Sequence, residues 1–377
     1  MLVRFSVRNY WCFREQVEID FTDKRNYDFG KECVRGDFLE KVVILGGNGS
    51  GKTSFGYAIM DIVTTVTGFT KDIGQHTEAC FINGDSGSDR ATFRYEFSWH
   101  GTSVVYEYGK TSPFRVVSES LTVDRRSVFS YDLDDPDASF FEPLLAEVVG
   151  SDASCLDGSK ALMKVLHDMP HRDDSPMCAV FDFAEHSLYY RAMWRMDDHI
   201  GMMDHDVDPS VFIMENGLID EFEQFLRGVG GVDISVGCSG GGITVATGTK
   251  EIPFYQGVSR GTAILSRLYV WIMRCRDRDS LIFFDDFDDL FDYRTAENVM
   301  DYIIRGSDAQ CVFVTHNVEL VSCDHMRPDC CFIMGYGCLS SLSSLTGKNI
   351  RRGNNLAKMV REGEFSTTDD NERSEDL

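Results

Sequence analysis

The sequence lacks several features that would assign it to other classes of protein. None of its apolar runs approaches the about 20 residues needed for a membrane-spanning helix, so no membrane anchor is expected. It also lacks an internal repeat, a long heptad pattern and a recognisable nuclease motif. These absences argue against a membrane protein, a repeat protein, a long coiled coil and an effector activity within the same chain.

Positive charge is scarce as well. The 37 Lys and Arg residues face 61 Asp and Glu residues, which gives a net charge of −24. Broad binding along a nucleic-acid backbone needs clustered Lys and Arg, so direct nucleic-acid binding would depend on a local patch and is not favoured. The acidic end of the chain, residues 366–377, is expected to be a disordered tail.

The twelve cysteines are scattered, and several lie in apolar runs. No apolar leader segment follows Met1, so these cysteines are expected to be reduced, in a cytoplasmic protein. With 377 residues, of which 43% are hydrophobic, the chain is long enough to bury one large core and to carry an insertion.

What the sequence does have is a phosphate-loop motif. The apolar run from Val42 to Leu45 predicts a buried parallel strand, and an apolar-periodic helix is predicted to follow the loop. The backbone N–H groups of such a glycine-rich turn converge on an anion. Lys52 is expected to reach the β and γ phosphates of ATP, and Thr53 to bind Mg²⁺. The predicted ATP-binding loop consists of Gly46, Gly47, Asn48, Gly49, Ser50, Gly51, Lys52 and Thr53.

Two carboxylates follow a second apolar strand, Leu281 to Phe284. Asp285 is expected to orient the water shell of Mg²⁺, and Asp286 to polarise the attacking water. His316 ends a third apolar strand, where ABC-type ATPases place a histidine that senses the γ-phosphate. An isolated Asp pair or His often only ends a strand, but together with the loop the catalytic interpretation is favoured.

A further segment lies between the loop and the carboxylates. Ser259-Arg260-Gly261-Thr262 precedes an apolar-periodic helix, which is the arrangement of an ABC signature segment. Such a segment contacts ATP that is bound to the opposite subunit. Ser259, Gly261 and Thr262 are therefore predicted to bind nucleotide across a homodimer or a higher homo-oligomer that closes around ATP.

With these motifs the chain resembles bacterial abortive-infection ATPases of the AbiLi-like class, which are AAA or ABC-type proteins related to OLD, RecF and SMC head domains. The resemblance covers nearly the whole chain. It implies an α/β fold, an ABC-type P-loop NTPase head with mixed and parallel sheets, interrupted by a largely helical insertion. The stretches that carry it are "VRFSVRNYWCFREQVEIDF", "ATFRYEFSWHGTSVVYEYGK", "SRGT" and "IRRGNNLAKMVREGEF".

The motif positions predict the organisation of the chain. The two halves of the ATPase head are placed at residues 1–110 and 251–365, and a mostly helical insertion that serves as a recognition element or lid at 111–250. Helices are predicted within "GSKALMKVLHDM" and "GLIDEFEQFLRGVG" of this insertion. The Asp- and His-rich segment 197–208 holds metal-ligand residue types, but it matches no metal template, and an exposed acidic loop is favoured.

Some positions depart from the family pattern. Asp286 replaces the usual glutamate and is one methylene shorter, so slow hydrolysis is expected. Asp292 stands where the following loop often has a histidine. Gln75 is only a weak candidate for the glutamine that bridges magnesium and water.

Two functions are compatible with these observations. In the first, the chain is a sensor or regulator ATPase that controls a separately encoded toxin or nuclease in antiphage defence. In the second, it is a DNA-maintenance ATPase of the RecF or SMC-head type that binds DNA directly. The acidic charge, the missing coiled coil and the closing stretch favour the first.

Overall fold

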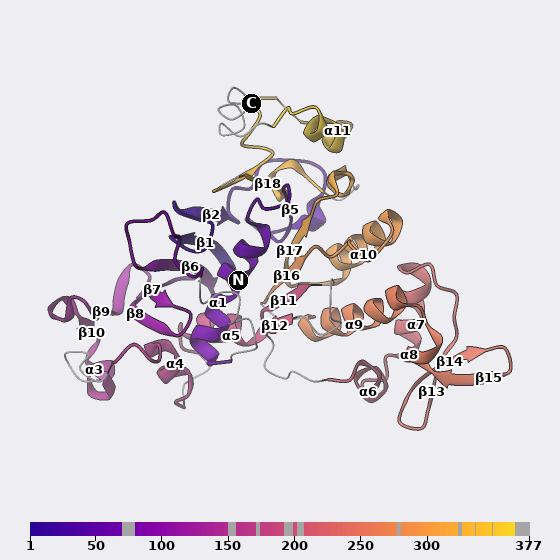
Figure 1. Ribbon diagram of the computed structural model, residues 1–377, viewed down its shortest axis with the longest axis horizontal. Helices are drawn as coiled ribbons and strands as arrows, with labels where there is room; N and C mark the ends of the chain where they lie inside the picture. The colour runs from indigo at the N-terminus through magenta and orange to yellow at the C-terminus, as the bar shows by residue number, and fades with distance from the viewer. Residues whose placement is uncertain are drawn as a thin grey trace.

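The computed structural model shows an α/β protein with two large sheets (Figure 1). In the part of the chain that the structure describes, each large sheet has seven strands, and a three-stranded and a two-stranded sheet accompany them. Among the described residues, no helix is long and apolar enough to cross a membrane. The structure describes residues 1–69, 80–149, 156–170, 174–191, 199–201, 207–276, 280–322, 326–335, 337–348 and 350–365.

The first large sheet is antiparallel, with the order β10-β9-β8-β7-β6-β1-β2. Buried and half-buried residues alternate along β6, so that Phe93, Tyr95 and Phe97 face the core. The stretch 91–110, one of those that carry the resemblance, forms β6 and most of β7, which pair antiparallel. The strands are β1 (Leu2–Arg8), β2 (Val17–Asp20), β6 (Ala91–Trp99), β7 (Thr102–Ser112), β8 (Arg115–Val123), β9 (Arg126–Asp132) and β10 (Phe140–Phe141).

The second large sheet is mixed, with the order β12-β11-β16-β17-β5-β18-β19. Its five inner strands are parallel and its two edge strands antiparallel. β5, β16 and β17 are buried along their whole length, as the continuous apolar runs predict. The strands are β5 (Lys41–Leu45), β11 (Leu188–Arg191), β12 (His199–Gly201), β16 (Leu281–Asp285), β17 (Gln310–Thr315), β18 (Cys331–Gly335) and β19 (Cys338–Ser341).

Helix α1 (Lys52–Thr67) lies between the two large sheets and joins them. On the antiparallel side, the rings of Phe55 and Phe5 lie 5.5 Å apart, and the Tyr95 hydroxyl donates to the Ala58 carbonyl at 3.0 Å. Asp61 accepts hydrogen bonds from Lys110 and Tyr108 of β7. Helices α4 (Leu162–His167) and α5 (Cys178–His186) also pack against α1. The helix that follows the phosphate loop is therefore fixed by both sheets.

The other elements surround these layers. Helices α7 and α9 pack together beside the three-stranded sheet, and α11 lies near the carboxyl end of the described chain (Figure 1). These elements are η1 (Lys31–Cys33), β3 (Val34–Arg35), β4 (Phe38–Leu39), η2 (Pro136–Ala138), α3 (Pro143–Val149), α6 (Pro209–Glu215), α7 (Ile219–Gly228), β13 (Val236–Ser239), β14 (Gly242–Thr247), β15 (Lys250–Pro253), α8 (Phe254–Gly257), α9 (Arg260–Cys275), α10 (Tyr293–Gly306), η3 (Val318–Ser322), η4 (Pro328–Cys330) and α11 (Leu356–Arg361).

The structure differs from the expectation of a mostly helical segment at 111–250. Residue 110 lies inside β7, and β8 and β9 extend the antiparallel sheet beyond it. The physical reason is that Leu121 and Phe129 continue the buried face of this sheet. The two predicted helices are confirmed as α4 and α7. The expected tail at 366–377 lies outside the described residues.

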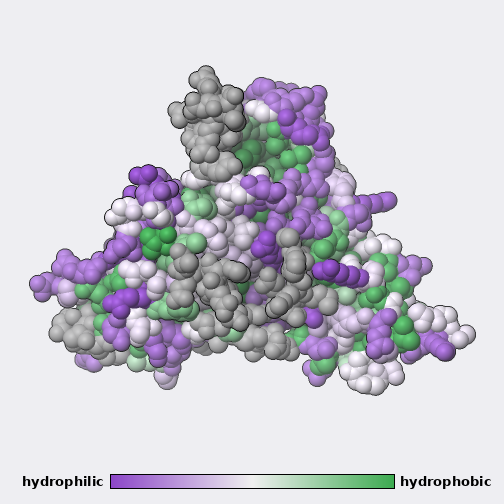
Figure 2. Space-filling view, in the orientation of Figure 1, coloured by the Kyte–Doolittle hydropathy of each residue, from purple (hydrophilic) through white to green (hydrophobic). Residues whose placement is uncertain are grey.

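The outer face of the antiparallel sheet is polar. Arg94 pairs there with Glu96 at 2.8 Å and with Glu107 at 3.0 Å. Figure 2 shows hydrophilic residues over much of the visible face, and hydrophobic residues in separate groups. This agrees with a charged surface around an apolar core.

Candidate nucleotide-binding site

The candidate site lies at one edge of the mixed sheet. The carboxyl ends of parallel strands meet at the same edge, and ligands of α/β proteins bind there. The phosphate loop follows β5, while Arg191, Asp285 and Thr315 are the last residues of β11, β16 and β17. In the sheet register, Arg191 lies beside Asp285 and Thr315 beside Leu45. The topology therefore brings four distant segments of the chain together.

The phosphate loop passes directly into α1. Its last glycine, Gly51, has a φ of 102°, and a Cβ there would lie 2.8 Å from the Phe13 ring, so the position requires glycine. The Lys52 ammonium donates to the carbonyls of Gly46 at 2.7 Å and Gly47 at 2.8 Å. Burial lowers the pKa of Lys52 although nearby carboxylates, Asp286 foremost, act in the opposite direction. The ammonium thus rests at the rim of its own loop.

Thr53 and Asp285 are in direct contact. The Thr53 hydroxyl donates to Oδ2 of Asp285 at 2.9 Å, and the Tyr189 hydroxyl donates to the same oxygen at 2.7 Å. Asp285 is completely buried, and its Oδ1 has no hydrogen-bond partner among the described residues. A hydroxyl beside a buried carboxylate oxygen that lacks a donor offers the oxygen atoms that Mg²⁺ prefers. These residues therefore fit the predicted magnesium site.

Asp286 and His316 face each other across the cavity mouth. Nε2 of His316 is 3.2 Å from Oδ1 of Asp286, and its Nδ1 is 3.4 Å from the Gly46 carbonyl. Asp286 has a φ of 47°, which is strained for a residue with a side chain. Burial first, and then the charge of Asp285, raise the pKa of the Asp286 carboxyl, while His316 partly offsets this. Strain and a raised pKa together are typical of a catalytic carboxylate.

These groups enclose a cavity of about 550 Å³. Four of the predicted residues do not line the cavity but contact residues of the loop that do: Gly46, Gly47, Ser50 and Asp285. The Gly46 and Gly47 carbonyls accept hydrogen bonds from Lys52, and Asp285 accepts one from Thr53. The Ser50 amide donates to the Gly47 carbonyl. The lining residues are Trp11, Cys12, Asn48, Gly49, Gly51, Lys52, Thr53, Ser54, Arg191, Asp286, Asp289 and His316.

Several lining residues were not singled out from the sequence. Trp11 has a φ of 49°, and its ring stacks on that of Tyr57 at 6.0 Å and 14°. Arg191 comes from β11, within the segment that the sequence assigned to the insertion. No sequence motif marks either residue, and only the pairing of β11 with β16 reveals Arg191.

The signature residues lie elsewhere in the chain's own fold. Ser259 precedes α9, its Oγ accepts from the Thr262 amide at 3.2 Å, and the two hydroxyls are 2.9 Å apart. A Cβ on Gly261 would find its nearest neighbours at 3.9 Å, so the position is open. Ser259 lines a separate cavity of about 300 Å³ rather than the one at the phosphate loop. Asp292, the other departure from the pattern, caps α10.

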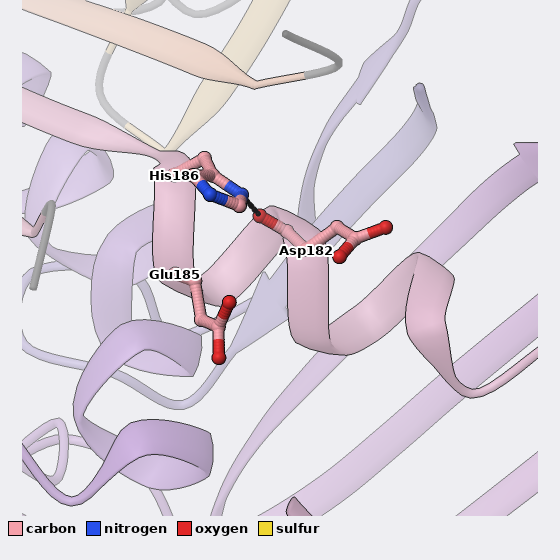
Figure 3. A group of neighbouring side chains, drawn as sticks. All are labelled: Asp182, Glu185 and His186. Atoms are coloured by element: carbon pink, nitrogen blue, oxygen red, sulfur yellow. Dashed lines mark hydrogen bonds between the residues drawn. The ribbon is translucent and has the colours of Figure 1, made fainter. Parts of the chain in front are cut away.

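A group of possible metal ligands on α5 does not form a convincing site. Asp182, Glu185 and His186 lie close together, but Figure 3 shows the two carboxylates pointing in different directions. His186 is bonded through Nδ1 to the Asp182 carbonyl at 2.9 Å, and Glu185 is bonded to His167 at 2.8 Å. These contacts are those of ordinary side chains on the surface of a helix.

The Asp- and His-rich segment 197–208 is described only in part. His199 is buried with its ring 4.7 Å from that of Trp271, and Asp208 caps α6 by accepting from the Ser210 amide at 2.7 Å. Both residues thus have structural roles. The remaining acidic and histidine residues of the segment lie outside the described residues, as does Gln75.

The fold and the site define a P-loop ATPase of the AAA and ABC type. Residues 41–322 match the family model described as "AAA domain, putative AbiEii toxin, Type IV TA system", and the chain belongs to this family. This confirms the AAA and ABC-type part of the resemblance, while the AbiLi-like and OLD parts stay predictions. No curated protein matches the chain.

Solved structures of two kinds are similar to this chain. An SMC head domain from Thermotoga maritima is 13% identical, with 90% of this chain and 97% of that chain covered and a TM-score of 0.46. The recombination mediator protein RecF with ATPrS is 12% identical, with 91% and 98% covered and a TM-score of 0.41.

Proposed function

We propose that this chain binds ATP with Mg²⁺, hydrolyses it slowly, and acts as a sensor or regulator of a separately encoded effector in antiphage defence. The observation that carries the nucleotide part is the convergence of the phosphate loop, the Thr53–Asp285 pair, Asp286 and His316 on one cavity. The family description, which names a putative toxin of a type IV TA system, supports the defence setting.

The loop supplies most of the binding groups for the phosphates. Its backbone N–H groups and the start of α1 offer donors and a positive helix end to an anion. Lys52 would exchange the carbonyls of Gly46 and Gly47 for phosphate oxygens, which form stronger, charge-assisted hydrogen bonds. Thr53 and Asp285 would hold Mg²⁺, which neutralises charge on the phosphates. The Trp11 ring, which also lines the cavity, offers a flat surface for the base.

Asp286 is the proposed general base. Its carboxylate would accept a proton from the water that attacks the terminal phosphate, and His316 at 3.2 Å would fix its orientation. A side chain one methylene shorter than glutamate holds this water less well, and small misplacements cost on the order of a hundredfold in rate. Slow turnover gives a long-lived ATP state, which suits a switch better than a motor.

The signature segment supports an ATP-dependent homodimer or higher homo-oligomer. Ser259, Gly261 and Thr262 stand at the start of α9, a helix of 16 residues whose amino end favours an anion. They do not line the nucleotide cavity of their own chain. In the proposal they contact the ATP of a second copy, and both sites are completed only on assembly.

Two features of the sequence support an effector that is encoded separately. Its sequence has no recognisable nuclease motif, and its net charge of −24 disfavours extended contact with nucleic acid. We assign recognition of the effector to the segment 111–250, which supplies strands to both large sheets and is thereby connected to the ATP site.

Nucleotide binding is tested by calorimetry on the unmodified chain and on Lys52→Ala. We expect the substitution to abolish measurable ATP binding and to leave the fold intact, because Lys52 is the cation of the loop. Lys348→Ala serves as the matched control, since the side chain of Lys348 is 67% exposed and far along the chain. Unchanged ATP affinity of Lys52→Ala would contradict the proposed site.

The regulatory role needs a separate experiment. The chain is co-expressed with the product of its neighbouring gene, purified, and tested for co-elution with and without ATP. Stable co-elution supports an effector partner. Tight, salt-sensitive binding of duplex DNA by the isolated chain would instead support the DNA-maintenance function.

A further inference from the structure

Arg191 brings a second cation to the nucleotide cavity. It is the last residue of β11, and in the sheet register it lies beside Asp285. Its Nε is 3.5 Å from Oδ2 of Asp285, and its Nη2 is 3.7 Å from Oδ2 of Asp286. The side chain is 26% exposed and forms part of the cavity lining together with Lys52. The guanidinium therefore lies between the two carboxylates and open to the cavity.

The charge balance of the cavity makes this position significant. The lining carries the cations Lys52 and Arg191 and the carboxylates Asp286 and Asp289, with Asp285 directly behind. Without Arg191, Lys52 alone would oppose the two lining carboxylates, Asp286 and Asp289, at a site that has to receive a polyanion. A second cation reduces this repulsion, and its effect is large because the site is partly shielded from water.

Arg191 lies at the catalytic end of the cavity. In the proposed binding mode Lys52 and the loop backbone hold the phosphates at the start of α1, whereas Arg191 lies 3.7 Å from Asp286, which itself faces His316. In phosphoryl transfer the attacking water is held beyond the terminal phosphate, so a group beside the general base faces the γ-phosphate. In this binding mode ADP would have no phosphate at this point.

We propose that Arg191 binds the γ-phosphate of ATP and thereby makes the site distinguish ATP from ADP; this rests on the proposed ATP binding. Mg²⁺ held by Thr53 and Asp285 would weaken the attraction between the Arg191 guanidinium and Asp285, and the γ-phosphate would offer the guanidinium an alternative partner. The planar guanidinium donates two parallel hydrogen bonds to phosphate oxygens, which an ammonium does not do. Through Arg191 the γ-phosphate is then connected to β11, and β11 pairs with β16, the strand that carries Asp285.

Calorimetry with a non-hydrolysable ATP analogue and with ADP, both with Mg²⁺, tests the proposal on Arg191→Ala and Arg191→Lys. We expect Arg191→Ala to lose about tenfold to a hundredfold in affinity for the analogue, as for a lost hydrogen bond to a charged group. Its affinity for ADP should stay within about twofold, which also shows that the variant is folded. Arg191→Lys keeps the charge but not the fork and should show an intermediate loss.

The control is Arg227→Ala, which removes an arginine with a 54% exposed side chain from α7 and should change neither affinity. An equal change for both nucleotides in Arg191→Ala and in Arg191→Lys, or no change in either variant, would overturn the role of Arg191. If Arg191→Ala also loses ADP binding, the test rests on Arg191→Lys. The proposal then requires that Arg191→Lys keeps its affinity for ADP and loses affinity only for the ATP analogue. An unmodified chain that binds neither nucleotide would overturn the proposed function itself.

Discussion

Asp286→Asn is expected to make the protein slower as an enzyme and more stable as a fold. The amide has the shape of the carboxylate but accepts no proton, so the contribution of a general base is lost. That contribution is about a hundredfold to ten-thousandfold, or roughly 3–5 kcal/mol of activation free energy. In single-turnover assays, ATP should persist on the variant, and the ATP-bound dimer should accumulate.

The gain in stability follows from the direction of the pKa shift. Burial and Asp285 raise the pKa of Asp286 above its ordinary value of 3.8, so the folded state binds more protons than the unfolded state between the two values. The free energy of unfolding therefore falls as the pH rises through this window, and the full penalty is present above it. Asparagine carries no such charge penalty, so we expect a gain of about 0.5–2 kcal/mol.

Urea unfolding of both proteins at pH 7 and at acid pH tests this. The difference in the free energy of unfolding should shrink as the pH falls toward 3.8, where the unmodified carboxyl also becomes neutral. Asp233→Asn is the control, because it removes the same charge from a side chain that is 91% exposed and is not part of the cavity lining. Hydrolysis by Asp286→Asn at the unmodified rate would show that Asp286 is not the base, and His316 would then be the first candidate.

Two further predictions concern glycines. Gly261→Arg should block ATP-dependent dimerisation in light scattering while the monomer still binds ATP, since the position is open in one chain and predicted to face ATP in the dimer; normal dimerisation would contradict the composite site. Gly51→Ala should lower the urea midpoint and weaken ATP binding, because its φ of 102° is costly for alanine, on the order of 1–3 kcal/mol. Gly47→Ala, where a Cβ meets nothing within 4 Å, should keep the urea midpoint of the unmodified protein. An equal fall of the midpoint in Gly51→Ala and Gly47→Ala would refute this reasoning.

The parts of the fold that could be predicted are those with local signals. The continuous apolar runs before Gly46, Asp285 and His316 predict buried parallel strands, and all three are found in one sheet. Parallel strands with polar residues at their carboxyl ends then predict a site at that edge. The phosphate loop, the Asp pair and His316 meet at this edge because each follows the carboxyl end of a parallel strand of the same sheet.

The parts that were missed depend on distant pairing or on backbone conformation. Arg191 enters the site only because β11 pairs with β16, and the four residues of β11 carry no motif that announces this partner. Trp11 faces the cavity from a turn in which its own φ is 49°. The strands β8 and β9 were assigned to a helical insertion, although Leu121 and Phe129 continue the buried face of the antiparallel sheet.

The central place of β5 in the mixed sheet bears on how the protein is made. This strand is synthesised long before both its neighbours, β17 and β18, which come from residues 310–335. Until the ribosome has released that region, an apolar strand and the complete phosphate loop remain without the sheet that positions them. Strand pairings between segments so far apart in the sequence form slowly, and the intermediates are prone to aggregate. A message truncated before β17 would therefore yield an aggregating fragment with an intact loop, never a partly active ATPase.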